Sequence, residues 1–248
     1  MVEFEAMERP IVAVTTLFST DNPSDRLRSN LAILTFNKLK SYNFDTVVID
    51  GGSSPDFLKR IDEVGIKAIA QEGKGLGVSR RQAIKLACDT GKTPIVIMEP
   101  EKVDFVSQIE KLSSLISEDR ADFVIPKRRS LKTYPVAQQL SEDFGNLFIK
   151  ELIGFDLDLF FGPRIFKGEM AQYFLNYDGK YGDAWESIFI PVLDAIQDGK
   201  RVLSVPIDYF HPKEQREAEE HDLDFFKKRV EMQLLPLIKS MELRWKKS

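Results

Sequence analysis

Hydrophobic residues in the first half of the chain alternate between short continuous runs and helically spaced positions. Runs rich in Val, Ile and Thr predict buried strands, and apolar residues three or four apart predict helices. Strands are predicted at residues 11–15, 45–50, 66–70, 94–98 and 122–125. Helices are predicted at residues 25–42, 55–64, from after Gly77 through Cys88, and 103–117. This alternation predicts an α/β fold with a mostly parallel central sheet and right-handed crossovers.

The second half of the chain is less regular. Its predicted elements are helices at 136–153, near 184–197 and from about Asp222, and a strand-like run at 201–207. The aromatic stretch 155–166 suits core packing better than the lining of a pocket. Without a repeat or a Pro/Gly-rich linker, residues 1–248 are interpreted as one domain with a nucleotide-binding half (about 10–130) and an acceptor-side half (about 131–248).

Polar side chains follow several of the predicted strands. Thr15 ends the first strand, Asp50 ends the second and is followed by Gly-Gly-Ser, and Glu99 and Glu101 follow the fourth. Loops at the carboxyl ends of parallel strands meet at one edge of the sheet, where such folds bind ligands. Two carboxylates suit a divalent ion that also holds phosphates. The alternative for both acids is a solvated turn, and for Asp50 a cap on its own turn.

The segment Gly73–Gly77 precedes a predicted helix and contains Lys74 between two glycines. Its glycine spacing is neither that of a phosphate-binding P-loop nor that of the dinucleotide fingerprint. Glycines still allow close backbone approach, and a helix N-terminus favours anions. Lys74, Arg80 and Arg81 could add positive charge there, or the segment could simply be a flexible start to the helix.

Composition narrows the functional class. A net charge of -4 argues against a nucleic-acid surface, which normally carries a basic patch. The short cluster Lys127–Arg129 is either a solvated loop or an anion contact. Residues 1–5 lack the features of a signal peptide, and no apolar run reaches the ~18 residues of a membrane span. We therefore expect a cytoplasmic chain with no transmembrane segment.

Three residues of the second half could carry chemistry. His211 follows the strand-like run 201–207 and could bind a transition metal, although a single histidine is more often structural. Asp183 and Glu186 could act as a general base or orient an acceptor. At helical spacing they could equally be an N-cap and a first-turn acid.

Taken together, these motifs resemble the GT-A type of nucleotide-sugar glycosyltransferase. The matching segments are Val12–Thr16, Val47–Ser53, Gly73–Arg81 and Ile95–Glu101. They agree in order and spacing with that family over residues 10–130. The resemblance implies a Rossmann-like sheet, a nucleotide-sugar donor bound at the strand ends, and Mn²⁺ or Mg²⁺ as cofactor.

The second half is similar to the branch that includes glucosyl-3-phosphoglycerate and mannosylglycerate synthases. The resemblance implies that Lys74 contacts the nucleotide and that His211 joins Glu101 on the metal. It implies a nucleotide-sugar site formed by Thr15, Leu17, Asp50, Gly52, Ser53, Lys74, Arg80 and Glu99. The expected acceptor contacts are Arg128, Arg129 and Arg164, and the expected catalytic residues are Asp183, as a base or acceptor-orienting group, and Glu186.

One departure from the family pattern concerns the metal motif. The usual Asp-x-Asp is Glu99-Pro100-Glu101 here, so each carboxylate reaches one methylene further. The predicted function is transfer of a glucose or mannose residue from a UDP- or GDP-sugar to a hydroxyl acceptor. A homodimer is one oligomeric state that the sequence allows. A sugar-phosphate nucleotidyltransferase and a non-catalytic sugar-nucleotide-binding protein remain alternatives. The sequence does not choose the base, the acceptor or the stereochemistry.

Overall fold

The computed structural model describes the chain from residue 9 to residue 245, except residues 20 and 22. Residues 1–5, on which the expectation of no signal peptide rests, lie outside the described residues. None of the helices in the described ranges combines the length and the hydropathy that a membrane crossing requires.

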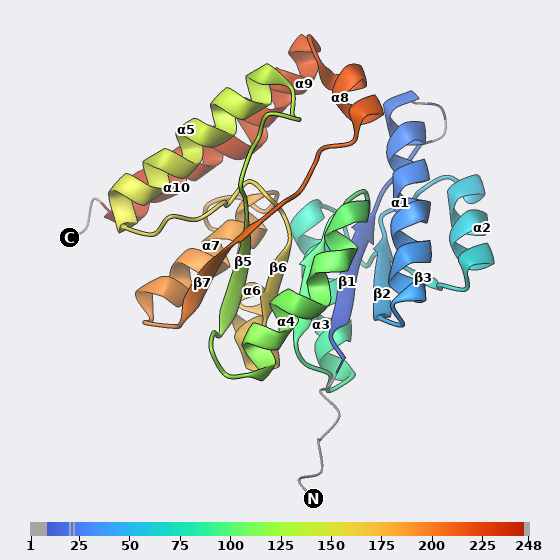
Figure 1. Cartoon of the computed structure of the whole chain (residues 1–248), viewed down its shortest axis with the longest axis horizontal. Helices are drawn as coiled ribbons and strands as arrows, with labels where there is room; N and C mark the ends of the chain where they lie inside the picture. The colour runs from blue at the N-terminus through green and yellow to red at the C-terminus, as the bar shows by residue number, and fades with distance from the viewer. Residues whose placement is uncertain (1–8, 20, 22, 246–248) are drawn as a thin grey trace, which may run out of the picture.

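A seven-stranded sheet forms the centre of the molecule (Figure 1). Its strands lie in the order β3-β2-β1-β4-β6-β5-β7. They are β1 (Ile11–Thr16), β2 (Asp45–Asp50), β3 (Ala68–Ala70), β4 (Ile95–Met98), β5 (Phe123–Arg128), β6 (Arg164–Phe166) and β7 (Val202–Ile207). Neighbouring strands are parallel except at β6, which runs antiparallel to both β4 and β5.

The two faces of the sheet bury alternate residues of each strand. Ile11 and Ala13 of β1 point to one core, and Val12 and Val14 point to the other. Helices cover both faces, which is why the central strands are apolar on both sides. The central strands therefore hold their ends rigidly, and the loops beyond them are positioned by the core.

The helices divide between these faces. One face carries α1 (Pro23–Ser41), α2 (Pro55–Val64) and α4 (Ile109–Ser117), preceded by the 3-10 turn η1 (Val103–Gln108). The other carries α3 (Leu76–Asp89), η2 (Gly168–Met170), α6 (Ala171–Leu175) and α7 (Glu186–Gln197). The remaining helical segments are α5 (Val136–Ile153), α8 (Lys213–Glu219), α9 (Leu223–Arg229), the π-helical η3 (Val230–Leu234) and α10 (Leu235–Trp245). In Figure 1, α5 is drawn in front of α10 at the same end of the sheet, and α9 and η3 contact α5.

The predicted α/β class and mostly parallel sheet are confirmed, and α2 and α5 have the predicted bounds. Three features differ from the prediction. The aromatic stretch contains β6, the predicted helix at 103–117 begins as a 3-10 turn, and the C-terminal helix is divided into α9, η3 and α10. The short helices α6 and α8 were not predicted, because five to seven residues give too little periodicity to recognise.

Candidate functional site

The carboxyl ends of β1, β2 and β4 meet at one edge of the sheet. Thr16 and Asp50 are register partners, and Val14 of β1 pairs with Met98 at the end of β4. Glu99 therefore leaves the sheet beside Thr15. The structure brings the predicted strand-end residues to the same edge, as parallel pairing requires.

Asp50 organises the loop that follows β2. Its Oδ1 accepts hydrogen bonds from the hydroxyls of Thr16 and Ser53, and its Oδ2 accepts from the backbone N–H of Gly52 at 2.9 Å and of Ser53 at 2.8 Å. Ser53 Oγ also accepts from the N–H of Phe18 at 2.9 Å. Asp50 and Ser53 are buried and fix the loop backbone, whereas Gly52 is exposed at this edge.

Glu99 lies beneath the edge of the sheet, in a small cavity of about 30 Å³ shared with Thr15, Arg80 and Gly162. Its Oε2 is buried and has no hydrogen-bond partner in the part of the chain that the structure describes. A Cβ on Gly162 would lie 1.8 Å from Glu99 Oε1, so glycine is required where this backbone passes the acid. Glu99 is therefore held by close packing, and its buried Oε2 is left without a partner from the described residues.

Glu101 is buried and paired with a cation from α1. Its Oε1 accepts from Arg28 Nη2 at 2.7 Å and from Arg28 Nε at 3.2 Å, while its buried Oε2 meets no partner among the described residues. Burial by itself would raise the pKa of Glu101, but the charges of Arg28 and Lys102 more than offset it, so the pKa lies below its usual value. Glu101 is an ionised carboxylate with one free oxygen.

His211 is buried against the ring of Tyr134, with 4.3 Å between centroids. Burial lowers its pKa, although a hydrogen bond with Glu219 acts in the opposite direction. Its Nε2 lies 3.1 Å from Glu219 Oε2, and its Nδ1 is buried with no partner from residues 9–245 as the structure describes them, without 20 and 22. Because the pKa of Glu219 is also below its usual value, Nε2 is the donor and Nδ1 keeps a lone pair. Metal-ligating histidines are commonly oriented in this way by a carboxylate.

These free atoms fit a divalent ion that also has ligands from elsewhere. Glu99, Glu101 and His211 each keep an unpaired buried atom. Yet within the described ranges no group of three His, Cys, Asp or Glu side chains is close enough to hold an ion by itself. Magnesium ions commonly use one or two carboxylates and complete their shell with substrate phosphates. The donor set therefore fits an ion that binds together with a diphosphate.

The loop before α3 presents Lys74 to solvent, next to the helix N-terminus. Arg80, one turn into α3, points inward instead. It donates to Ala184 O at 2.7 Å and to Ser187 Oγ at 3.1 Å, and it stacks on Trp185. Burial lowers the pKa of Arg80 to about 10. Leu17, at the end of β1, is 65% exposed and can offer an apolar surface at the same edge.

Asp183 connects the loop before α7 to the start of α3. Both carboxylate oxygens accept from Arg81, at 2.5 and 2.7 Å, and its carbonyl accepts from Gly77 N at 2.9 Å. A Cβ on Gly77 would lie 2.0 Å from the Asp183 carboxylate, so this contact also requires glycine. The role of a free general base does not fit this arrangement. Glu186 is buried, accepts from Ala184 N at 3.1 Å, and behaves as the predicted first-turn acid.

The three arginines expected to contact an acceptor have other partners. Arg164 is completely buried and donates to the carbonyls of Phe161, Pro163 and Leu159, and burial lowers its pKa to about 10. Arg128 is buried between Asp158 and Glu142. Arg128 and Arg164 are therefore structural in this conformation and do not reach a surface ligand. Arg129 is exposed and lies 3.6 Å from Asp208.

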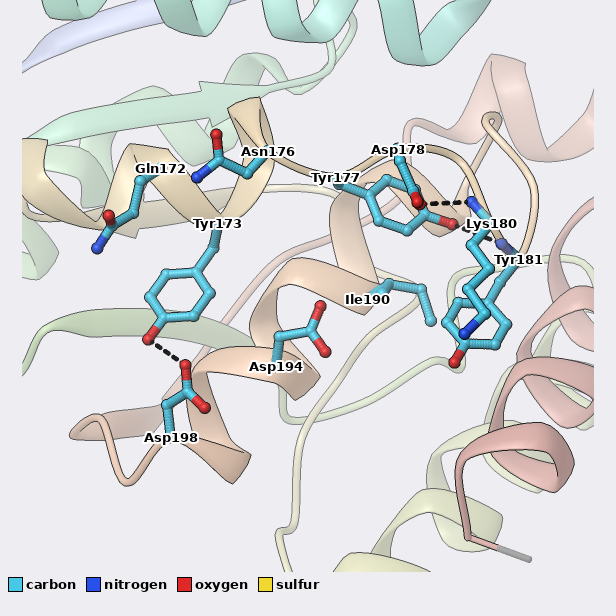
Figure 2. Close-up of a pocket in the computed structure, with 10 residues that line it drawn as sticks. All are labelled: Gln172, Tyr173, Asn176, Tyr177, Asp178, Lys180, Tyr181, Ile190, Asp194 and Asp198. Atoms are coloured by element: carbon cyan, nitrogen blue, oxygen red, sulfur yellow. Dashed lines mark hydrogen bonds between the residues drawn. The ribbon is translucent and has the colours of Figure 1, made fainter. Parts of the chain in front are cut away.

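A second hollow lies away from the strand ends (Figure 2). It has a volume of about 470 Å³ and lies between α6, α7 and the loop that joins them. Tyr173 donates to Asp198 at 2.9 Å, and Tyr177 donates to Gly182 O at 2.7 Å. None of the predicted site residues lines this hollow, and Tyr177 connects it to the loop that carries Asp183.

Sequence reasoning missed the two cations beside Glu101. Arg28 is 73 residues away from Glu101, so no local spacing reveals the pair. Lys102 directly follows the acidic motif, and that adjacency was a signal that could have been used. Its ammonium lies 5.8 Å from the ring centroid of Phe161 and 5.6 Å from that of Tyr209.

Comparison with known proteins supports the fold. No family model and no curated protein sequence matches the chain. Among solved structures, glucosyl-3-phosphoglycerate synthase of Mycobacterium tuberculosis aligns with a TM-score of 0.64 and 12% identity, over 94% of this chain and 80% of that one. Its complex with UDP aligns with a TM-score of 0.67 and 11% identity, over 95% and 80%. Its complex with Mn²⁺, UDP-glucose and phosphoglyceric acid gives 0.61 and 11%, over 93% and 80%.

These similarities confirm, for the fold, the resemblance expected from the sequence. The chain has the GT-A type of architecture found in these glycosyltransferases. The similar structures include complexes with Mn²⁺ or Mg²⁺ and UDP. At 10–13% identity the likeness concerns the fold.

Proposed function

We propose that this chain is a metal-dependent glycosyltransferase that moves a hexose, glucose or mannose, from a UDP- or GDP-sugar to a hydroxyl acceptor. The observation that carries the proposal is the pair Glu99 and Glu101, each with an unpaired buried oxygen, at the carboxyl end of β4. In an α/β sheet of this kind, ligands bind outside the carboxyl ends of the strands, so the two glutamates lie where a donor would bind.

The donor would lie across the ends of β1, β2 and β4. Thr15, Leu17 and the loop held by Asp50 would contact the nucleoside, with Gly52 allowing close backbone approach. Lys74 and the N-terminus of α3 would face the phosphates. Arg80 would not contact the donor directly. It would influence the site through the charge of Glu99, with which it shares a cavity. Residues 10–130 would thus form the donor half and residues 131–248 the acceptor half.

Glu101 and His211 would hold Mn²⁺ or Mg²⁺ together with the donor phosphates. The ion would neutralise charge on the departing nucleoside diphosphate. Glu219 would fix the His211 ring and keep Nδ1 unprotonated. Arg28 would keep Glu101 ionised and oriented.

The acceptor half would bind a hydroxyl-bearing molecule, including small anionic acceptors such as the phosphoglyceric acid present in the similar structures. Arg129 is the exposed arginine of the predicted set and would be the anion contact. Asp183 would position the acceptor-side loop through Arg81. A retaining transfer needs no protein base, and this arrangement agrees with that stereochemistry.

We also propose that two copies of the chain form a homodimer through α5. Its buried face carries Gln138, Ser141 and Glu142, whereas its outer face carries large apolar side chains. The exposed fractions are 53% for Val136, 67% for Leu140, 53% for Phe144 and 56% for Leu147. Spaced four, four and three residues apart, they form one stripe. A specific dimer buries roughly 800 Å² per partner, and this stripe can form the apolar centre of such an interface.

The proposed activity is tested first by donor binding. Calorimetric titration with UDP, GDP and their hexose conjugates, each with and without Mn²⁺, should give tight binding of one nucleotide that strengthens with the ion. Lys74→Ala should weaken that binding by about tenfold, the loss of one charged hydrogen bond. If no nucleotide binds under any condition, the transferase proposal fails.

A non-catalytic sugar-nucleotide-binding protein is the second candidate. The ion pair between Arg28 and Glu101 favours it, because that pair uses one oxygen of the predicted metal ligand. Binding without turnover for any hexose donor and hydroxyl acceptor would select this candidate.

A further inference from the structure

Two cations flank the acid that would hold the metal. Arg28 comes from α1, and its Nη2 lies 2.7 Å from Glu101 Oε1. Its side chain is 38% exposed, whereas that of Glu101 is 6% exposed. The guanidinium thus covers the acid and still faces solvent at the ligand-binding edge of the sheet.

Lys102 is the second cation. Its ammonium lies over the rings of Phe161 and Tyr209, at 5.8 and 5.6 Å from their centroids. It interacts electrostatically with Glu99 and Glu101 and also with His211. Lys102 therefore lies close enough to Glu99, Glu101 and His211 for its charge to act on all three. Within the described ranges no hydrogen bond occupies the ammonium of this partly buried side chain, so its donors are unused.

The cations Arg28 and Lys102 change the net charge around the two glutamates. Two glutamates without a counter-charge would repel a diphosphate strongly unless a divalent ion came first. Here Arg28 pairs with Glu101, and the charges of Lys102 and Arg80 act on Glu99. The charge of Arg229 acts on Glu219, whose hydrogen-bond partners His211 and Gln215 are uncharged. The edge of the sheet is therefore not strongly negative before any ion binds.

We propose that Arg28 and Lys102 allow this chain to bind the diphosphate of a nucleotide without a divalent ion, which then strengthens binding but is not required for it. The inference rests on the proposed function, since it assumes that a nucleoside diphosphate binds at this edge. Lys102 makes the direct contact with phosphate oxygens. Arg28 shields Glu101 and adds a second contact from its exposed side.

The test is calorimetry of the intact chain with UDP and with GDP, once in excess EDTA and once in Mn²⁺. The unaltered chain should bind one of the two in EDTA. Lys102→Met should reduce that affinity by about tenfold or more, and should make binding depend more strongly on Mn²⁺. Lys85→Met is the matched control: Lys85 is an exposed lysine of α3 paired with Asp89, and its loss should change neither titration.

The outcomes separate the two proposals. Binding by the unaltered chain with Mn²⁺ but not in EDTA overturns this inference and leaves the proposed function in place. Equal affinities of Lys102→Met and the unaltered chain in EDTA also overturn it. Absence of binding in both conditions removes the proposed function, and this inference with it. Because the unaltered chain decides the main question, the test does not depend on the folding of a variant.

Discussion

The ion pair between Arg81 and Asp183 limits the role that Asp183 can play, because both of its carboxylate oxygens accept from Arg81. The two ion-paired side chains come from α3 and from the loop before α7, 102 residues apart. Gly77 allows the approach and donates its N–H to the Asp183 carbonyl. Asp183 thereby connects the loop before α7 to the start of α3.

This pair gives a prediction that distinguishes positioning from proton transfer. If Asp183 acts through Arg81, then Asp183→Asn and Arg81→Met should raise the acceptor KM to a similar extent, about tenfold. The double variant should be little worse than either single one, because both remove the same contact. Steady-state kinetics with varied acceptor measures this. A loss of kcat of several orders of magnitude confined to Asp183→Asn would instead identify it as the base.

At the scale of elements, an ion cluster joins the amino-terminal ends of two parallel strands. Asp122, just before β5, accepts from Arg201 N at 2.9 Å and from Arg201 Nη2 at 2.8 Å. Lys167, at the end of β6, lies 2.8 Å from Asp122 and also pairs with Asp119. The cluster therefore fixes β5, β6 and β7 relative to one another.

The cluster predicts an acid-dependent loss of stability. Hydrogen bonds from Arg201 and Lys167 lower the pKa of Asp119 to about 2 and lower that of Asp122 as well. A depressed pKa in the folded state contributes stability above the unfolded value near 4, and that contribution is lost as pH falls toward 2. Asp122→Asn should lower the free energy of unfolding by roughly 1 kcal/mol at pH 7, since Arg201 is half-exposed.

Urea unfolding between pH 2 and pH 7 measures this effect. The difference between Asp122→Asn and the unaltered chain should shrink below pH 4. A difference that stays constant across this range would mean that the ionised Asp122 is not the source of the stability.

The sequence predicts most helices and strands of the first half but not which distant side chains meet. The elements of the first half of the chain followed from hydrophobic periodicity, because its central strands are buried on both faces and its helices are mostly long. The antiparallel strand β6 did not, since three residues that include a buried arginine, Arg164, resemble no strand pattern. Side-chain partners such as Arg28 for Glu101, or Glu142 for Arg128, depend on how the folded chain brings distant segments together. The sequence also could not show which of two neighbouring arginines is buried: Arg128 is buried and Arg129 is exposed.

At the scale of the whole molecule, α5 presents its apolar stripe outward and its polar face inward. Arg128 and Arg229 hold Glu142 from below, which accounts for the polar residues on the buried face. Segments α9 and η3 pack beside α5, and Leu223 of α9 is also exposed. An apolar surface of this extent on a folded chain commonly marks an interaction site.

Replacing a residue in the centre of that stripe tests the dimer. Leu140→Glu should convert a dimer into a monomer in light scattering, because a carboxylate buried between two copies would be unpaired. Leu34→Glu is the control, since Leu34 is a similarly exposed leucine on α1. A monomeric unaltered chain, or a dimer that survives Leu140→Glu, would contradict the role of α5.

Hexose transfer itself decides whether this chain is a glycosyltransferase. The unaltered chain, UDP-glucose or GDP-mannose, Mn²⁺ and phosphoglyceric acid are incubated, and product and nucleoside diphosphate are followed together by mass spectrometry. We expect equal amounts of glycosylated acceptor and nucleoside diphosphate with one donor, and at least about a hundredfold lower rate in Glu101→Gln, which removes the ionised ligand but keeps the side-chain shape. Lys85→Met should match the unaltered chain. Binding of the donor without any transfer to this or other hydroxyl acceptors, or an undiminished rate in Glu101→Gln, would contradict the account.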